Sequence, residues 1–317
     1  MKKFKILVTA AGGASGLYTI KLLKEDKNTT IVAVDPDKHA VGLFLADARY
    51  TIPKAGNSLF ISRIIDIVQR ENIDAILPNI SDELPIFAKN ISQIPCKVVL
   101  SPLKTITICH DKSKTYKYFQ EIVSVPRSFI YGNIKDSDFP LFVKPKISRG
   151  SNYTYKVMNK KHLDTIISLL EFGGYGKDDL IITEYIPGRE YTVDVLFNLA
   201  GKYIVSAARV RLLTQSGVSV TARVIKSSVI DTFIQHIVSH LTFYGPINIQ
   251  LKETQEGGLK LLEINPRLSG GISLTAKAGL NIPILLLRLL RNEPISERLL
   301  EYKELTVGRF YKEIVMQ

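Results

Sequence analysis

Cysteine is scarce and tryptophan is absent: only Cys96 and Cys109 occur among the 317 residues. Two cysteines are too few for a disulfide framework, and their spacing is not that of a metal site. Both are expected to be buried thiols in a reducing compartment. This points to a cytoplasmic protein.

Long apolar runs are also absent. A membrane-spanning helix needs about 20 consecutive apolar residues, and no segment of this chain reaches that length. The basic start, Met1 to Lys5, resembles the first region of a signal peptide, but the apolar run after it gives way to Gly12 and Gly13. A strand and its turn fit this pattern better. We expect no membrane partner.

Acidic residues are outnumbered, with 30 Asp and Glu against 42 Lys and Arg, a formal net charge of +12. This excess can attract nucleotides, nucleic acids or acidic lipids. The basic residues are dispersed along the chain, and no nucleic-acid-binding module is recognisable. We therefore expect a lysine-rich surface and no nucleic-acid partner. The length predicts two or three packed units.

The first third of the chain alternates apolar, β-branched runs with helical patterns. Such an alternation predicts a doubly wound parallel sheet. This α/β domain should span residues 1–102 and end near Ser101-Pro102. Its strands are predicted at 4–9, 30–34, 75–77 and 97–100.

The remainder, residues 103–317, has an α+β pattern. A helical stretch covers about residues 102–122, and a late helix from Ala276 to Asn292 should be interrupted near Pro283. Between them, Pro126 and Pro140 mark a change to strand-rich sequence. The predicted strands are 141–145, 153–158, 180–184, 191–197 and 203–210.

Two later strands predict a hairpin. Residues 246–252 and 259–267 are joined by a turn around Glu256-Gly257. If the turn is symmetric, Gln250 lies opposite Glu263, and directly opposed residues share a face. The position of these polar side chains therefore depends on the strand register.

The same register predicts a cluster of oxygen donors. Glu263 and Asn265 share a face because side chains alternate along a strand, and Asn248 lies opposite Asn265. One carboxylate with amide oxygens suits Mg²⁺ that is also held by phosphate oxygens. Spacing alone fits an ordinary polar face equally well. The residues expected to pack the opposite, apolar face are Ile249, Leu251, Leu262 and Ile264.

Two further segments have the pattern of nucleotide-binding elements. Lys144 ends a hydrophobic strand, and residues 147–152 follow as a loop whose backbone N–H groups can contact phosphate. The strand 181–194 breaks at Pro187-Gly188, which exposes backbone groups of the kind that an adenine edge binds. Glu190 follows and could accept hydrogen bonds from a ribose. A plain hairpin and a surface glutamate are the alternatives.

Taken in order, these segments resemble the ATP-grasp superfamily, in particular the ATP-binding halves of the carbamoyl phosphate synthase large subunit. The order is Asp111-Lys112 at a helix start, Phe-Val-Lys-Pro145, Glu-Tyr-Ile-Pro-Gly-Arg-Glu190 and Leu-Leu-Glu-Ile-Asn-Pro-Arg267. The resemblance covers residues 1 to about 290, and Glu-x-Asn-Pro-Arg is its specific element.

The resemblance implies a pre-ATP-grasp domain over 1–102 and an ATP-grasp fold of two α+β subdomains over 103–317. The lid subdomain would span approximately 125–185, and the metal and substrate subdomain 186–317. The chain is too short for the synthase's two ATP sites. We therefore do not expect carbamoyl phosphate formation by this chain alone.

The resemblance also implies a role for individual residues. Arg267 and Lys144 would be catalytic, with Arg267 steadying an acyl phosphate. Gln250, Glu263 and Asn265 would hold magnesium, with glutamine where many relatives have an acid. The implied ATP contacts are Lys112, Lys144, Ser148, Arg149, Gly150, Ser151 and Asn152 at the phosphates, the backbone of Glu184, Tyr185 and Ile186 at adenine, and Glu190 at the ribose.

The implied activity is ligation of a small-molecule carboxylate to an amine, or to a thiol, with release of ADP and phosphate. Mg²⁺ would neutralise the transferring phosphoryl group, and Mn²⁺ is an alternative cation. A nucleotide-binding protein without turnover is a different hypothesis. The sequence does not fix the oligomeric state, and a homodimer is one state that it allows. Activity could also require a partner subunit.

Two motifs of the first domain leave alternatives open. Gly12, Gly13 and Gly16, with Asp35 after the next strand, are compatible with an NAD(P)-dependent oxidoreductase, although the dinucleotide fingerprint is incomplete. We favour a structural or substrate-binding role. Asp82 and Glu83 follow a strand end, where they could grip an amine substrate or cap a helix.

Overall fold

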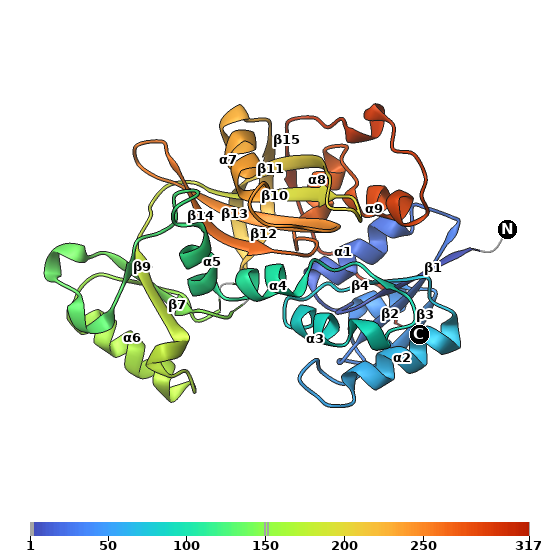
Figure 1. The fold of residues 1–317 in the computed structure, drawn as a ribbon, viewed down its shortest axis with the longest axis horizontal. Coiled ribbons are helices and arrows are strands. Elements are labelled where there is room, and N and C mark those ends of the chain that lie inside the picture. The colour runs from blue at the N-terminus through green and yellow to red at the C-terminus, as the bar shows by residue number, and fades with distance from the viewer. Residues whose placement is uncertain (1–2, 149, 151, 317) are drawn as a thin grey trace.

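The computed structural model describes residues 3–148, 150 and 152–316. In Figure 1 the N-terminal sheet lies at one end of the molecule, a small sheet with α6 (Lys160–Phe172) lies at the other, and the largest sheet lies between them. Within the described residues, no helix combines the length and apolar character that crossing a membrane requires.

The N-terminal sheet is parallel and five-stranded, with the order β3-β2-β1-β4-β5. This confirms the predicted doubly wound domain. The central strands β1, β2 and β4 are buried on both faces and are largely apolar: Ile6 packs in one core cluster and Leu7 in the other. The elements are β1 (Phe4–Val8), α1 (Ala14–Leu23), β2 (Thr29–Asp35), β3 (Ala48–Thr51), α2 (Phe60–Glu71), β4 (Ala75–Leu77), α3 (Leu84–Lys89) and β5 (Lys97–Val98).

The predicted helical stretch over 102–122 is two helices, α4 (Leu103–His110) and α5 (Lys112–Phe119). They separate at Asp111, whose backbone is extended. The Asp111 side chain accepts hydrogen bonds from the Ser113 and Lys114 amides, at 2.8 and 3.2 Å, and so caps α5. This cap starts a new helix where helical periodicity alone predicted continuation.

The small sheet is four-stranded, with the order β6-β9-β7-β8, and α6 packs in its core. The predicted strand 153–158 is confirmed but shorter, at 155–157. Leu141, Val143 and Val157 face Leu163 of α6 in one apolar cluster. The strands are β6 (Ser128–Phe129), β7 (Leu141–Pro145), β8 (Tyr155–Val157) and β9 (Leu180–Glu184).

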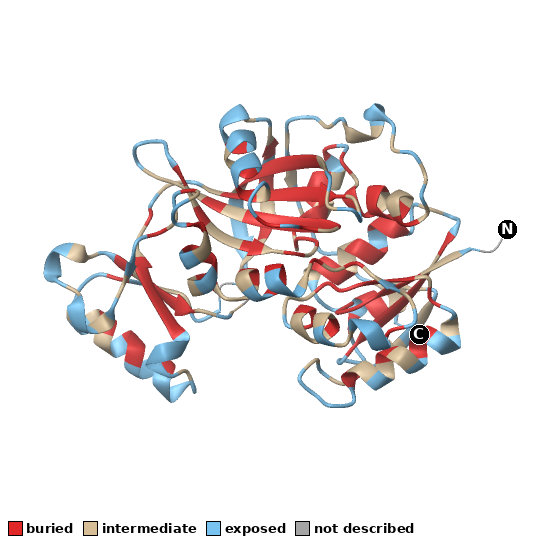
Figure 2. Ribbon diagram, in the orientation of Figure 1, coloured by how far each residue is buried: buried red, intermediate tan, exposed pale blue. Residues whose placement is uncertain are grey.

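The largest sheet is antiparallel, with the order β14-β13-β10-β11-β12-β15. One face is apolar and packs against α5 and α7 (Ser228–Val238), as the buried band in Figure 2 shows. Alternation puts polar residues of β10, such as Thr192, on the opposite face. The strands are β10 (Glu190–Phe197), β11 (Tyr203–Gln215), β12 (Val218–Ile225), β13 (Pro246–Glu253), β14 (Leu259–Asn265) and β15 (Leu305–Gly308).

The register of the β13–β14 hairpin is the predicted one. Gln250 lies opposite Glu263, and Asn248 lies opposite Asn265. The pairing then shifts by one residue, because Leu251 pairs with Leu261.

That shift is a β-bulge, and it corrects one prediction. Leu262 was expected in the apolar layer, but Leu261 takes that place and is fully buried there. Leu262 is the extra residue, and its side chain lines a cavity on the polar side of the sheet.

The late helix is also divided, into α8 (Ile272–Lys277) and α9 (Ile282–Leu290). The break precedes Pro283, which lies in the first turn of α9, where its missing N–H costs nothing. Asn281 caps this helix by accepting a hydrogen bond from the Ile284 amide at 3.2 Å.

The bulge predicts opposite responses of two neighbouring leucines. Leu261→Ala should lower the free energy of unfolding by about 2–5 kcal/mol, because it leaves a cavity in the core. Leu262→Ala should lower it by less than about 1 kcal/mol, since its side chain faces a cavity already. Urea denaturation of both variants measures the difference, and the reverse order of stability would show that the bulge is misplaced.

Candidate functional site

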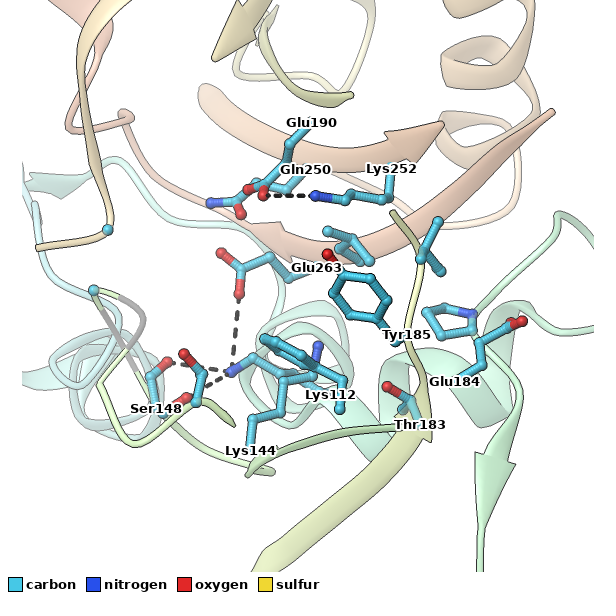
Figure 3. Close-up of a pocket in the computed structure, with 17 residues that line it drawn as sticks. Lys112, Lys144, Ser148, Thr183, Glu184, Tyr185, Glu190, Gln250, Lys252 and Glu263 are labelled. Atoms are coloured by element: carbon cyan, nitrogen blue, oxygen red, sulfur yellow. Dashed lines mark hydrogen bonds and ion pairs between the residues drawn. The ribbon is translucent and has the colours of Figure 1, made fainter. Parts of the chain in front are cut away.

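A cavity of about 830 Å³, its open mouth included, lies between the small sheet and the polar face of the largest sheet. Figure 3 shows Lys144 and Thr183 on its small-sheet side, facing Gln250 and Glu263 across the space. Sequence-distant segments therefore meet here. Residues that line the cavity include Lys112, Phe142, Lys144, Ser148, Gly150, Glu184, Tyr185, Ile186, Glu190, Gln250, Lys252, Leu262 and Glu263.

Lys112, the first residue of α5, joins the phosphate-loop segment to the hairpin. Its Nζ lies 3.8 Å from Glu263 Oε2 and donates to the Ser148 carbonyl and hydroxyl at 3.3 and 3.1 Å. Burial lowers the pKa of Lys112, although the Glu263 carboxylate acts in the opposite direction. A buried ammonium with one partly exposed carboxylate is ready to bind a further anion.

Lys144 is positioned by a residue that the sequence did not single out. Its Nζ donates to the Tyr116 hydroxyl at 2.9 Å, and that hydroxyl donates to the Leu262 carbonyl at 2.9 Å. Burial lowers the pKa of Lys144 to about 8, despite the nearby Glu263 and Glu190 carboxylates. The bulge therefore supplies both an apolar wall and the carbonyl that orients Tyr116.

Glu263 is the carboxylate of the oxygen-donor cluster. Burial raises its pKa, but Lys112, a hydrogen bond from Asn265 and Lys144 together hold that pKa below its ordinary value. Glu263 is therefore ionised at neutral pH. Its Oε1 accepts from Asn265 Nδ2 at 2.9 Å, and Gln250 Oε1 accepts from Arg211 at 3.4 Å.

The donor set fits a cation that is also held by its substrate. Within the described part of the chain, no three His, Cys, Asp or Glu side chains gather as metal ligands. One carboxylate and neutral amides suit Mg²⁺ whose remaining ligands are phosphate oxygens and water. The Asn265 oxygen now accepts from Ser81 and Arg267, at 3.2 and 3.4 Å. Its amide must rotate for that oxygen to join Glu263.

The linker between β9 and β10 has an uncommitted backbone donor at Ile186, which lines the cavity. The Glu184 amide donates to the Arg127 carbonyl at 2.9 Å, and the Tyr185 amide donates to the Pro140 carbonyl at 3.2 Å. No acceptor among the described residues is bonded to the Ile186 amide. The Glu184 side chain pairs with Lys260, so only backbone groups here are suited to an adenine edge.

Glu190 is not an isolated surface glutamate. It pairs with Arg211 and lies 3.6 Å from Lys252 Nζ, and all three residues come from adjacent strands. Figure 3 shows Glu190 beside Gln250 at the far wall of the cavity. Arg211 also donates to the Gly217 carbonyl at 2.7 Å, which ties the β11–β12 turn to this wall.

The predicted phosphate loop approaches that same turn. A Cβ on Gly217 would lie only 2.3 Å from the Gly150 carbonyl carbon, so the contact requires glycine. Ser148 and Gly150 line the cavity, as Asn152 lines the adjoining one. Arg149 and Ser151, two of the predicted phosphate contacts, lie outside the described residues. The sequence predicted the strand before Gly217, at 203–210, but not β12 after it, so this turn was missed.

A second cavity of about 1110 Å³, its open mouth included, adjoins the first. It lies between the largest sheet and the glycine turn of the first domain, and the two cavities share Ser148, Gly150, Gly217, Gln250 and Glu263. Glu263 is therefore at their junction. Other residues that line the second cavity include Gly13, Ala14, Ser15, Asn79, Asn248, Arg209, Arg211, Asn265, Arg267, Ser269, Gly270 and Gly271.

The predicted substrate residues are only partly brought together. Arg267 lines the second cavity, and its guanidinium donates to Ser81 Oγ at 3.0 Å and the Leu268 carbonyl at 2.7 Å. Asp82 is exposed and lines a third, smaller cavity, which shares Ser148 and Glu263 with both large cavities. Glu83 is buried, accepts from the Thr9 hydroxyl and lines neither large cavity. It occupies the N-cap of α3 without a side-chain cap, so neither predicted role describes Glu83.

The glycine turn after β1 has a structural explanation. Asp35, nearly buried, accepts a hydrogen bond from the Gly12 amide at 2.8 Å. A Cβ on Gly16 would lie 2.2 Å from the Ala10 carbonyl oxygen, so close helix–strand packing requires glycine there. Asp35 is thus engaged with the turn itself, which argues against a role on a dinucleotide ribose.

Sequence comparisons agree with this arrangement. A family model described as "PylC-like, N-terminal domain" matches residues 6–99, and one described as "ATP-grasp in the biosynthetic pathway with Ter operon" matches residues 176–309. The chain belongs to the ATP-grasp superfamily. The predicted family is thereby confirmed, together with its coarser implication of an ATP-grasp enzyme.

Curated relatives of this ATP-grasp chain include carbamoyl phosphate synthase large chains. That of Helicobacter pylori strain 26695 is 23% identical over 270 residues, which cover 78% of this chain and 24% of the relative. That of Methanobrevibacter smithii is 23% identical over 297 residues, or 83% and 27% of the two chains. The chain therefore spans about a quarter of these relatives' length.

Solved structures confirm the ATP-grasp fold. Biotin carboxylase from Campylobacter jejuni has a TM-score of 0.74 at 18% identity, over 93% of this chain and 72% of the other. The biotin carboxylase domain dimer of Hydrogenobacter thermophilus 2-oxoglutarate carboxylase, in complex with MgADP and bicarbonate, scores 0.75 at 17%, over 95% and 73%. Carboxyaminoimidazole ribonucleotide synthase from Aspergillus clavatus, complexed with ATP, scores 0.76 at 12%, over 95% and 80%.

The Tyr116 hydroxyl should matter more than a comparable one on the same helix. Tyr116→Phe leaves the Leu262 carbonyl and Lys144 without a buried partner, so it should cost about 1–3 kcal/mol of unfolding free energy. Tyr118→Phe removes an exposed bond to the His240 carbonyl and should cost less than about 0.5 kcal/mol. Chemical denaturation of both variants gives the comparison, and equal losses would contradict this role for Tyr116.

Proposed function

We propose that this chain is an ATP-dependent ligase that activates a carboxylate as an acyl phosphate for attack by an amine, with a thiol as the alternative nucleophile. The observation that carries the proposal is the junction of two cavities at Glu263. One cavity has the groups suited to a nucleotide, and the other has arginines suited to an acid. A reaction between the two ligands requires such a meeting point.

The first cavity supports binding of ATP with its phosphates near the lysines. Lys112 and Lys144 are buried ammonium groups from two different elements, and both would face the phosphates. Ile186 offers a backbone donor for adenine, while Leu262 supplies an apolar surface. Glu190, held by Arg211 and Lys252, is available to a ribose.

The metal would be held by Glu263, Gln250 and Asn265 together with phosphate oxygens. Mg²⁺ at this place supplies charge neutralisation of the transferring phosphoryl group. The chain's own contribution is to fix the one carboxylate: Lys112 and Lys144 keep Glu263 ionised, and Asn265 Nδ2 orients it until the amide rotates toward the metal. Mn²⁺ has the same preference for oxygen ligands and is the expected substitute.

In the second cavity, Arg267 would hold the acid. Its guanidinium is oriented by Ser81 and the Leu268 carbonyl, next to Asn265 on the metal side. An acid oxygen would attack the γ-phosphorus, and ADP would leave with the electrons of the broken P–O bond. The nucleophile would then attack the acyl carbon, with Arg267 stabilising the oxyanion until phosphate leaves.

Each sheet belongs to a different part of the chain, and we propose for these parts the boundaries and roles that the sequence predicts. Residues 1–102 would close the acid cavity, approximately 125–185 would cover the nucleotide, and 186–317 would carry the metal and the acid. A nucleotide-binding protein without turnover remains the competing function, and it would bind Mg-ATP but release no ADP with any acid.

The nucleotide assignment predicts that Mg-ATP binding depends on Lys144. Lys144→Ala should weaken Mg-ATP binding about tenfold or more, because a buried charge-assisted contact is lost. Lys146→Ala is the matched control: Lys146 Nζ donates to the Asp178 carbonyl outside the cavity, and this change should leave affinity unaltered. Isothermal titration measures both, and unchanged affinity in Lys144→Ala would remove this lysine from the site.

The metal assignment predicts that ADP formation depends on Glu263. Glu263→Gln keeps size and hydrogen bonding but removes the carboxylate, so acid-dependent ADP release should fall by about a hundredfold or more. The thermal midpoint should also fall, because the buried Lys112 loses its carboxylate partner. Gln250→Glu should retain metal binding.

Glu253→Gln is the control on the same hairpin. Glu253 pairs with Arg189 at the end of β13 and lines neither cavity. This variant should release ADP at the wild-type rate. Near wild-type turnover in Glu263→Gln would show that the metal site is misassigned.

A further inference from the structure

The second cavity is longer than a small acid needs. It begins at Glu263 and reaches the first-domain residues Gly13, Ala14 and Ser15. An acid as small as bicarbonate would occupy only the Glu263 end.

The far end is formed by the N-terminus of α1, a ten-residue helix. Gly13 at its N-cap has no side chain to cap it, and the first turn has no acidic residue. Among the described residues, no acceptor is bonded to the amides of Ala14, Ser15 and Gly16. Ala14 and Ser15 line the cavity, so their N–H groups and the helix dipole favour an anion at this end.

Arg209 provides an independent observation at the same cavity. Its side chain is 1% exposed and is held by Asp194, with nitrogen–oxygen distances of 3.1 and 2.9 Å, and by Thr275 and Ser269. Its Nη1 has no hydrogen-bond partner among the described residues. A buried guanidinium N–H without an acceptor is costly, and an anionic ligand would satisfy it.

Two consecutive glycines bring these groups together. A Cβ on Gly270 would lie 3.5 Å from the Ala14 Cβ, and a Cβ on Gly271 would lie 2.3 Å from Arg209 Nη1. The Gly270-Gly271 backbone therefore lies between the α1 N-terminus and Arg209. Three arginines line the cavity, and Glu263 is its one carboxylate among the described residues. Asp194 and Glu190 already pair with Arg209 and Arg211. The unpartnered Arg209 Nη1 and the free amides of α1, and not a surplus of positive charge, therefore favour an anion here.

We propose that the acid substrate carries a second anionic group, a carboxylate or a phosphate, that binds between the N-terminus of α1 and Arg209. Its reacting carboxylate would lie at Glu263 and Arg267. This inference rests on the proposed ligase function. It narrows the substrate class to elongated acids with an anion at each end, and it excludes bicarbonate as the acid.

Binding of defined probes tests the proposal in the presence of Mg-ADP. The probes are straight-chain dicarboxylates from glutarate to pimelate, the corresponding phosphonocarboxylates, and monocarboxylates of the same lengths. Isothermal titration should give at least one dianion that binds about tenfold more tightly than its length-matched monocarboxylate. Preference between the first two series distinguishes carboxylate from phosphate.

Two variants of Ala14 test whether the second anionic group binds at the N-terminus of α1. Ala14→Asp places a negative charge in the first turn of α1, where it suits the helix but repels a bound anion. It should weaken the dianion about tenfold and leave the monocarboxylate and Mg-ATP unaffected. Ala14→Asn introduces a side chain of the size of aspartate without its charge, and this variant should bind the dianion as wild type does.

Three results would overturn the inference: no saturable dianion binding, equal affinity for both classes, or equal losses in the two variants. ADP release measured with the same acids separates this inference from the proposed function. Dianion binding that Ala14→Asp weakens, without ADP release, would retain the site and reject the ligase. ADP release driven equally by monocarboxylates would retain the ligase and reject the site.

Discussion

The pairing of β13 with β14 is the constraint on which the site depends. Gln250 opposite Glu263 puts the carboxylate on the polar face of the largest sheet, whereas a slip of one residue would turn it into the apolar layer against α7. Because of the bulge at Leu262, β14 has an apolar side chain in the core and its carboxylate on the polar face. Leu261 stays in the core, and Leu262 gives its side chain to the cavity and its carbonyl to Tyr116.

The nucleotide cavity therefore has more buried positive charge than negative charge. Lys112 and Lys144 are both buried, and burial lowers the pKa of each. Glu263 compensates for only part of this cost. Phosphate groups would complete the compensation, so cations that destabilise the empty protein become favourable contacts when a nucleotide binds. In the same way, Arg209 and Arg267 of the adjoining cavity would favour an anionic acid.

Much of this arrangement could be predicted because it depends on local periodicity. Alternation of residues 246–265 predicted the hairpin register, and the Glu-x-Asn-Pro-Arg267 segment pointed to the superfamily. The parallel first domain followed from its apolar runs in the same way. These features are carried by neighbours in sequence, so the sequence alone was sufficient.

What could not be predicted depends on contacts between distant segments. The Tyr116 hydroxyl matters only because α5 packs on the bulge of β14. Glu83 is buried, and there it accepts a hydrogen bond from Thr9 of another segment. The second cavity likewise appears only when α1 and Arg209 meet across Gly270-Gly271. The hydrophobic periodicity of a sequence carries no information about contacts between distant segments.

The central claim is that Glu263 marks the place where nucleotide and acid meet. A crystal structure with ADP and Mn²⁺, which scatters anomalously, tests it most directly. The account predicts an anomalous peak bonded to a Glu263 oxygen, with the ADP phosphates between that peak and Lys144. An ordered ADP whose Mn²⁺ peak lies away from Glu263, or an adenine outside the cavity beside Ile186, would contradict it.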